Sequence, residues 1–275
     1  MNTFYDFYKN NNGNLSEILF NLFWHGQFQE AVDFCAPWVN AFGAIEKLGM
    51  KDAIVYLHCL IMINKYPQKS LNFPEPPSKE EALSLISYEI LQEKKSFVSR
   101  TKEEKFLSQP HCLSKALLAC KIGIENNCNT VIETGTFLGV SSYLFSGIFS
   151  EVHTIEADPM LHRTSTYWLN QLRNNIRTHN GNSGEILSKL LAQINEPCLF
   201  FLDAHYSEGI TSIKYGFCPL IEELTNIFST SQNHTIVIDD IRCMETQGYP
   251  SFSEILDTIP AGKTVQIAHD QMIIN

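Results

Sequence analysis

From residue 130 onward, short apolar runs alternate with amphipathic stretches. The apolar runs predict strands at residues 130–134, 151–156, 175–179, 198–203, 234–239, 264–268 and 271–275. Apolar residues spaced three and four apart predict helices near residues 139–149, 159–173, 183–194, 216–230 and 251–258. Strands that alternate with helices are typical of an α/β fold, in which helices cover both faces of a largely parallel sheet.

The chain before residue 110 has a different pattern. From about residue 14 to residue 65 the apolar residues follow helical spacing, beginning with a stripe at Leu15, Ile18, Leu19, Leu22 and Phe23. The segment 26–34 resembles the turn and second helix of a tetratricopeptide unit, but a repeat needs neighbours to bury its apolar face. An ordinary helical cap is therefore the favoured interpretation of this region.

Two connections interrupt this first part of the chain. Prolines gather between residues 66 and 78 and predict a linker. The segment 78–81, Ser-Lys-Glu-Glu, has the pattern of a capping box and predicts a helix that runs to about Glu93. The stretch 94–110 is charged and lacks a clear period, so it predicts a second connection before an amphipathic helix at residues 112–126.

Length and pattern together predict two parts. A chain of 275 residues is long enough for one large domain, or for a core domain and a smaller one. We expect a helical N-terminal region, residues 1–95, that serves as a cap or an interaction domain. The α/β domain follows at residues 110–275.

Composition excludes several classes of partner. The formal net charge is −10 and no cluster of Lys or Arg stands out, which disfavours binding to nucleic acid or to an anionic membrane. The eight cysteines form no C-x-x-C pair, as expected for free thiols in a reducing compartment. The N-terminal residues lack the order of a signal peptide, and no apolar run is long enough to span a bilayer. We therefore expect a cytoplasmic protein.

The segment 130–142 carries the most specific signal in the chain. It predicts a strand that ends at Glu133, a turn with Gly135 and Gly139, and the start of a helix. Unpaired N–H groups at a helix start can face a ligand. Glu156 ends the next strand about twenty residues later, where a carboxylate can accept both hydroxyls of a ribose. The pattern predicts a nucleoside-binding crevice.

The missing features narrow the choice of nucleoside. A dinucleotide fingerprint needs glycine where this chain has Glu133, and a carboxylate there would repel a pyrophosphate. This makes a nicotinamide-dependent oxidoreductase improbable, although the fold alone does not exclude it. No phosphate loop of the G-x-x-x-x-G-K-[ST] type occurs. A carboxylate beside a helix start suits a ligand with an ammonium and a carboxylate, such as the methionine end of S-adenosylmethionine.

At these residues the chain resembles the class I S-adenosylmethionine-dependent methyltransferases, whose first motif runs E/D-x-G-x-x-x-G. The resemblance covers the chain from about residue 110 to its C-terminus. It implies a Rossmann-like sheet of seven strands whose last strand runs antiparallel. It also implies that a set of nine residues contacts the cofactor: Glu133, Gly135, Thr136, Gly139, Ser141, Glu156, Asn182, Ser183 and Asp203.

Within that set, the resemblance implies that Glu133 contacts the methionine ammonium, directly or through water. It implies that Glu156 binds the ribose hydroxyls. The turn at Asn182 and Ser183 lies where methyltransferases contact adenine, and many relatives have an acid where Asn182 stands. The alternative is a glycine turn followed by Ser183 as the N-cap of the next helix.

Acids also end the fourth and fifth predicted strands, at Asp203 and at the pair Asp239-Asp240. Ligands bind beyond the carboxyl ends of strands in such sheets, so several acids there favour a functional site. The segments 200–209 and 237–242 resemble a subgroup that includes the sugar O-methyltransferases of macrolide biosynthesis, the macrocin type. The resemblance implies that Asp203, Asp239 and Asp240 hold Mg²⁺, a cation that prefers oxygen ligands.

A hydroxyl is a poor nucleophile at neutral pH, and a divalent cation lowers its pKa. Asp203 or His205 would then accept the proton as the catalytic base. His205 departs from the macrolide-type pattern, so it is a metal ligand, the base, or a hydrogen-bonding loop residue. Whether a metal assists the reaction is left open.

The leading hypothesis is a methyltransferase that acts on an oxygen of a small molecule or a sugar. The alternative is a scaffold or interaction protein that binds the cofactor without turnover and uses its helical N-terminal region as the working surface. The sequence does not identify the methyl acceptor. The apolar N-terminal helices could also form a homo-oligomer interface, and the oligomeric state is equally open.

Overall fold

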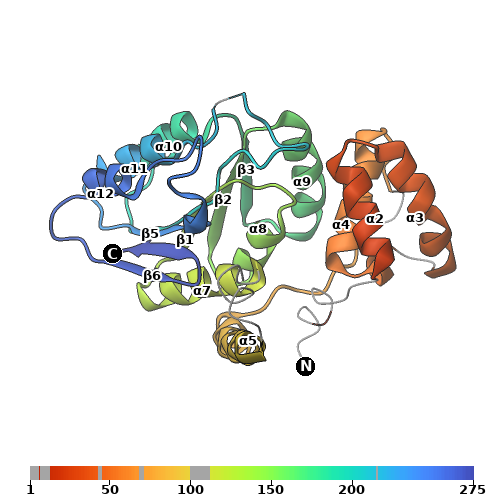
Figure 1. The fold of residues 1–275 in the computed structure, drawn as a ribbon, viewed down its shortest axis with the longest axis horizontal. Helices are drawn as coiled ribbons and strands as arrows, with labels where there is room; N and C mark the ends of the chain where they lie inside the picture. Colours follow the sequence, from red (N-terminus) through yellow and green to blue (C-terminus); the bar gives the residue numbers. More distant parts are fainter. Residues whose placement is uncertain (1–5, 7–12, 43–44, 68–70, 100–111, 215) are drawn as a thin grey trace.

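A central β-sheet organises the structure (Figure 1). The computed structural model describes residues 6, 13–42, 45–67, 71–99, 112–214 and 216–275. Within these residues, seven strands form one sheet in the order β3-β2-β1-β4-β5-β7-β6. They are β1 (Thr130–Thr134), β2 (Glu151–Glu156), β3 (Ile176–Asn180), β4 (Leu199–Leu202), β5 (Thr235–Ile238), β6 (Val265–Ala268) and β7 (Gln271–Ile274).

The strand directions confirm the predicted sheet. β1 to β5 pair in parallel, whereas β7 pairs antiparallel with both β5 and β6. The chain order reverses between β1 and β4, so a crevice opens beyond the carboxyl ends of these central strands.

Helices cover both faces of the sheet, and alternating side chains hold the two layers (Figure 1). One layer contains α7 (Cys112–Glu125), α8 (Val140–Phe145) and α9 (Pro159–Leu172), and the other contains α10 (Ser183–Leu191), α11 (Leu220–Phe228) and α12 (Phe252–Thr258). On β1, Val131 packs in the core under the first layer and Ile132 in the core under the second. β4 alternates in the same way, with Phe201 and Leu202. This is the period of two that a strand buried on both faces requires.

Several predicted element ends differ from the structure. The helix that begins at Lys79, α5 (Lys79–Ser99), continues six residues beyond the predicted end at Glu93. The predicted second connection therefore starts later, and its residues 100–111 lie outside the described part. α8 and α11 are shorter than predicted, because capping and turns end a helix before its apolar pattern ends.

The helices α2 to α4 come before α5 and pack together beside the sheet (Figure 1). They are α2 (Asn14–Trp24), α3 (Phe28–Phe42) and α4 (Met50–Met62), with a short 3-10 turn at Ile45–Leu48. α4 contacts α9, and buried side chains of these helices belong to the same core cluster as the α7–α9 face of the sheet. Among the described residues, no helix has the length and apolarity needed to cross a membrane.

Candidate functional site

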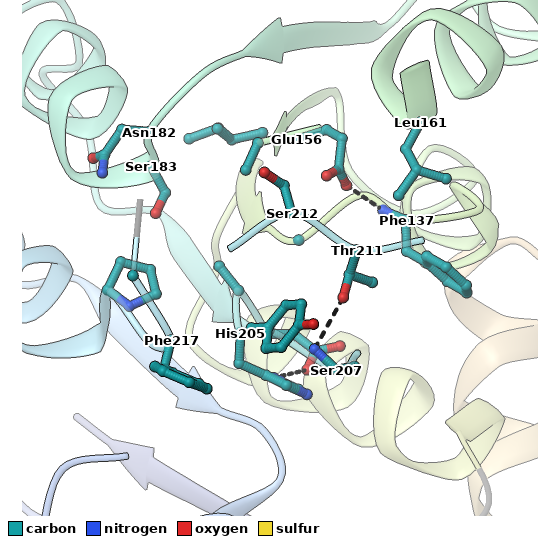
Figure 2. A pocket seen from close by; sticks show the side chains of 18 of the residues that line it. Phe137, Glu156, Leu161, Asn182, Ser183, His205, Ser207, Thr211, Ser212 and Phe217 are labelled. Carbon is teal, nitrogen blue, oxygen red and sulfur yellow. Dashed lines mark hydrogen bonds and ion pairs between the residues drawn. The ribbon is translucent and has the colours of Figure 1, made fainter. Parts of the chain in front are cut away.

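A cavity of about 330 Å³ opens at the carboxyl ends of β1 to β5. Its volume is at the lower end of the range for small-molecule sites. Glu156 and His205 lie at opposite ends of the cavity, and Asn182 and Ser183 lie along one side (Figure 2). The cavity therefore joins the predicted nucleoside end of the site to the predicted acid cluster.

The turn after β1 brings the backbone against the loop that follows β4. Gly135 has φ +88°, and a Cβ there would lie 2.5 Å from the carbonyl oxygen of Asp203. Only glycine fits this conformation and this spacing. Gly139 has φ +80°, and a Cβ there would press on Trp168 and Leu169. Gly135 lines the cavity, whereas Gly139 serves the packing of α8 against α9.

Glu133 lies in a closed hydrogen-bond network. Its carboxylate accepts hydrogen bonds from the hydroxyls of Ser141, Ser142 and Thr154, and the residue is fully buried. Thr136 extends the network, since its hydroxyl lies 2.6 Å from that of Thr154. Burial raises the pKa of Glu133, and the three hydroxyl donors counteract that rise.

Glu133, Thr136, Gly139 and Ser141 are not among the described residues that line the cavity. The structure thus places four of the nine predicted cofactor residues behind the cavity wall, where they fix the turn between β1 and α8. Their contact with the cofactor stays a prediction.

Glu156 faces the cavity with a carboxylate held by backbone groups. The N–H groups of Phe137 and Asp158 donate to its two oxygens at 2.8 and 2.9 Å. Each carboxylate oxygen keeps a further acceptor position, so two more donors can bind. Burial raises the pKa of Glu156 to about 7, against the lowering effect of the backbone N–H groups of Asp158, Phe137 and Ala157.

Asn182 and Ser183 lie at the start of α10. The Asn182 side chain accepts from the N–H of Glu185 at 3.0 Å and is the N-cap of the helix. The alternative assignment of Ser183 as N-cap is therefore wrong, because Ser183 already has helical geometry. Both residues line the cavity. The Asn182 amide N–H₂ donates no hydrogen bond that the structure records, and it can serve a ligand.

Asp203, His205 and Asp240 come together at the other end of the cavity. His205 lies between the two acids, with Nδ1 3.6 Å from Asp203 and Nε2 3.8 Å from Asp240. The Asp203 side chain is 32% exposed, so it is accessible from the cavity. One ligand atom from each of the three residues lies within 4.8 Å of the others, a spacing that can hold a metal ion.

Asp239 belongs to a different set of contacts. Its Oδ2 lies 2.9 Å from the ammonium of Lys115, and Gln271 donates to its Oδ1 at 3.2 Å. The trio at metal spacing contains His205 rather than Asp239, and the metal set of Asp203, Asp239 and Asp240 stays a prediction. The alternation of side chains along β5 explains this placement: Asp239 follows Val237 on the face that α7 covers.

Two cations neutralise Asp240. Its Oδ1 accepts from the Lys115 ammonium and from Arg242 Nη1, the latter at 2.6 Å. Arg242 thus pairs with Asp240 and also bonds Asp270. Asp240 adopts φ +53°, a left-handed backbone conformation, and its carboxylate shares the Lys115 ammonium with Asp239.

The charges around the trio set its proton affinities. Burial raises the pKa of Asp203 well above its usual range, and the neighbouring Asp239 and Asp240 raise it further. Burial opposes the ionisation of Asp240, but hydrogen bonds from Arg242 and Lys115 outweigh it and lower its pKa. Burial also lowers the pKa of His205. At neutral pH His205 is therefore an unprotonated imidazole, able to accept a proton.

The N-terminal helices contribute a wall of the cavity. Trp24, at the end of α2, lines it and packs edge-on against Phe137 at a ring distance of 6.1 Å. A Cβ at Gly209 would lie 2.4 Å from the Trp24 ring, so the loop after β4 runs directly beneath this indole. Among the described residues of the N-terminal helices, Trp24 is therefore the side chain that lines the cavity.

Sequence reasoning missed Lys115 and Trp24. Lys115 stands within the run Leu113–Cys120 of α7, in which each residue is buried. A lysine in such a run indicates a buried ionic partner, although the sequence does not say which acid. Trp24 ends an apolar stripe, and nothing in the sequence around it indicated a position in the functional site.

No protein-family model and no curated protein matches the sequence. Among solved structures, the O-methyltransferase TomG of Streptomyces achromogenes, in complex with S-adenosylmethionine, matches at 16% identity and a TM-score of 0.44 over 70% of this chain and 88% of that chain. An O-methyltransferase from Bacillus cereus, in complex with S-adenosylhomocysteine, matches at 15% identity and a TM-score of 0.42, over 71% of this chain and 88% of that chain. A putative caffeoyl-CoA O-methyltransferase from Staphylococcus aureus matches at 18% identity and a TM-score of 0.42, over 71% of this chain and 97% of that chain. These similarities concern the fold alone.

Proposed function

We propose that this chain, which has the fold of the class I methyltransferases, transfers a methyl group from S-adenosylmethionine to an oxygen of a small molecule or sugar. The observation that carries the proposal is the cavity that joins Glu156, beyond β2, to Asp203 and His205, beyond β4. A carboxylate suited to ribose and an imidazole suited to proton transfer thus line the same cavity.

The residues on the nucleoside side fit the cofactor. Glu156 has two acceptor positions left for the ribose hydroxyls, and Asn182 has an amide N–H₂ for the adenine ring. Asp203 lies on the cavity wall beside Gly135 and offers a carboxylate to the methionine ammonium. The hydroxyls of Ser141, Ser142 and Thr154 already donate hydrogen bonds to Glu133, so we assign Glu133 a structural role in holding the turn between β1 and α8.

His205 is the base in this proposal. Its imidazole is unprotonated at neutral pH, and the Asp240 carboxylate, 3.8 Å from Nε2, stabilises the imidazolium once the acceptor proton arrives. Bound S-adenosylmethionine supplies the methyl group: the acceptor oxygen forms a bond to the methyl carbon while the carbon–sulfur bond breaks and its electron pair stays on sulfur. The proton of the hydroxyl moves to His205.

The residues do not fit the predicted magnesium set of Asp203, Asp239 and Asp240. Lys115 and Gln271 hold Asp239, and Lys115 and Arg242 hold one oxygen of Asp240. We therefore derive the proton transfer from His205 and its flanking acids, without a metal.

Calorimetry tests the cofactor assignment. We expect saturable binding of S-adenosylmethionine and S-adenosylhomocysteine to the full chain, with one site each. Absence of saturable binding of either ligand at millimolar concentration would contradict the proposal. Cofactor binding without transfer to any hydroxyl acceptor would favour the alternative scaffold function.

The affinity for the nucleoside should depend on pH through Glu156. With a pKa of about 7, Glu156 is ionised above that pH and protonated below it. Since the ionised form has more acceptors for the ribose hydroxyls, affinity should fall about tenfold from pH 8 to pH 6. The probe is 5′-methylthioadenosine, which lacks the amino-acid end and so avoids the titration of Asp203. Its dissociation constant is measured by calorimetry across this range.

Glu156→Gln should weaken methylthioadenosine binding about 10–100-fold and remove most of the pH dependence, because an amide is not ionised. Glu151→Gln, at the other end of β2 and half-exposed, is the matched control and should change neither quantity. An unaltered pH profile in Glu156→Gln would show that another group titrates.

A further inference from the structure

Lys115 is an ammonium buried inside an acid cluster. Its side chain is 6% exposed, its Nζ lies 2.9 Å from Asp239, and it also bonds Asp240. A lysine is rarely buried this deeply unless anions offset its charge. Burial alone would lower the pKa of Lys115, but Asp239 and Asp240 raise it above its usual value, so the charge is permanent at physiological pH.

We infer that the Lys115 ammonium takes the place of the divalent cation expected at these strand ends, so that a side-chain charge holds the acids together and the site works without a metal ion. The catalytic role of Lys115 rests on the proposed function, whereas the lack of metal binding does not.

The oxygens that a magnesium ion would need are already bound. Mg²⁺ requires near-octahedral oxygen ligands and retains several waters. Both oxygens of Asp239 have partners in Lys115 and Gln271, and Oδ1 of Asp240 binds Lys115 and Arg242. The remaining trio shares the Asp240 carboxylate with these two cations, whose charges repel an incoming divalent ion.

The lysine also has a positioning role in the proposed reaction. By binding Oδ1 of Asp240, Lys115 leaves Oδ2 facing His205 Nε2 at 3.8 Å. Together with Arg242, which binds the same oxygen, it fixes the orientation of the Asp240 carboxylate. A fixed cation can do this continuously, because it does not dissociate.

The test is a titration of the full chain with Mn²⁺, followed by electron paramagnetic resonance of the free ion, with Mg²⁺ as competitor. We expect no saturable site in the wild type. Lys115→Met removes the charge at similar length and should create one Mn²⁺ site, which a second change, Asp203→Asn, should abolish. Lys121→Met is the matched control on the same helix, because Lys121 pairs with Glu125 at the surface; it should bind no Mn²⁺.

Saturable binding of Mn²⁺ to the wild type, lost in Asp203→Asn, would overturn the inference. So would a folded Lys115→Met that gains no site. If circular dichroism shows that Lys115→Met does not fold, the wild-type titration decides by itself. Binding of S-adenosylmethionine is measured on the same samples. Its absence would contradict the proposed function but would leave the Mn²⁺ result unaffected.

Discussion

Replacing His205 with alanine is expected to lower kcat for methyl transfer by about 10²–10⁴-fold, the usual contribution of a general base. The affinity for S-adenosylhomocysteine should change little, because His205 lies at the far end of the cavity from Glu156 (Figure 2). The measurement is transfer of a labelled methyl group from S-adenosylmethionine to sugar and catechol acceptors, paired with calorimetry.

The pH profile separates a base from a structural residue. Because burial lowers the pKa of His205, the wild-type rate should fall only below pH 6.5, and His205→Ala should lose this limb. His162→Ala serves as control, since His162 is not among the described cavity residues. An equal loss of cofactor affinity in His205→Ala, with an unchanged profile, would contradict the assignment.

Gly135→Ala is expected to destabilise the protein by about 3–5 kcal/mol and to abolish cofactor binding. A left-handed conformation costs an L-residue about 1–2 kcal/mol. The added Cβ would also lie 2.5 Å from the Asp203 carbonyl oxygen, so the loops after β1 and β4 must separate. Urea unfolding measures the change in the free energy of unfolding.

Gly262→Ala is the matched control for this substitution. Gly262 has a similar φ of +94°, but no other atom lies within 4 Å of a Cβ built there. It should therefore cost about 1–2 kcal/mol, for backbone conformation alone. Equal costs at the two glycines would show that the loop contact at Gly135 contributes nothing.

The sequence by itself determined the architecture of the α/β part. Pairs such as Val131 and Ile132 are buried on opposite faces, so each central strand needed two apolar faces, whereas a covering helix needed one. These periods are local and can be read without knowing any partner. The same logic placed Glu156 and Asp203 at one edge of the sheet, because parallel strands end together.

Only the tertiary structure decided what each acid does. Glu133 and Glu156 both end strands, yet Ser141 and Ser142 of α8 enclose Glu133 while Glu156 faces the cavity. Asp239 and Asp240 both contact Lys115, which lies 125 residues before Asp240 in the chain. Such partners come from packing between distant segments, which determines whether a charge faces solvent, a ligand or another side chain. Periodicity along the chain records where a residue lies, but not what lies against it.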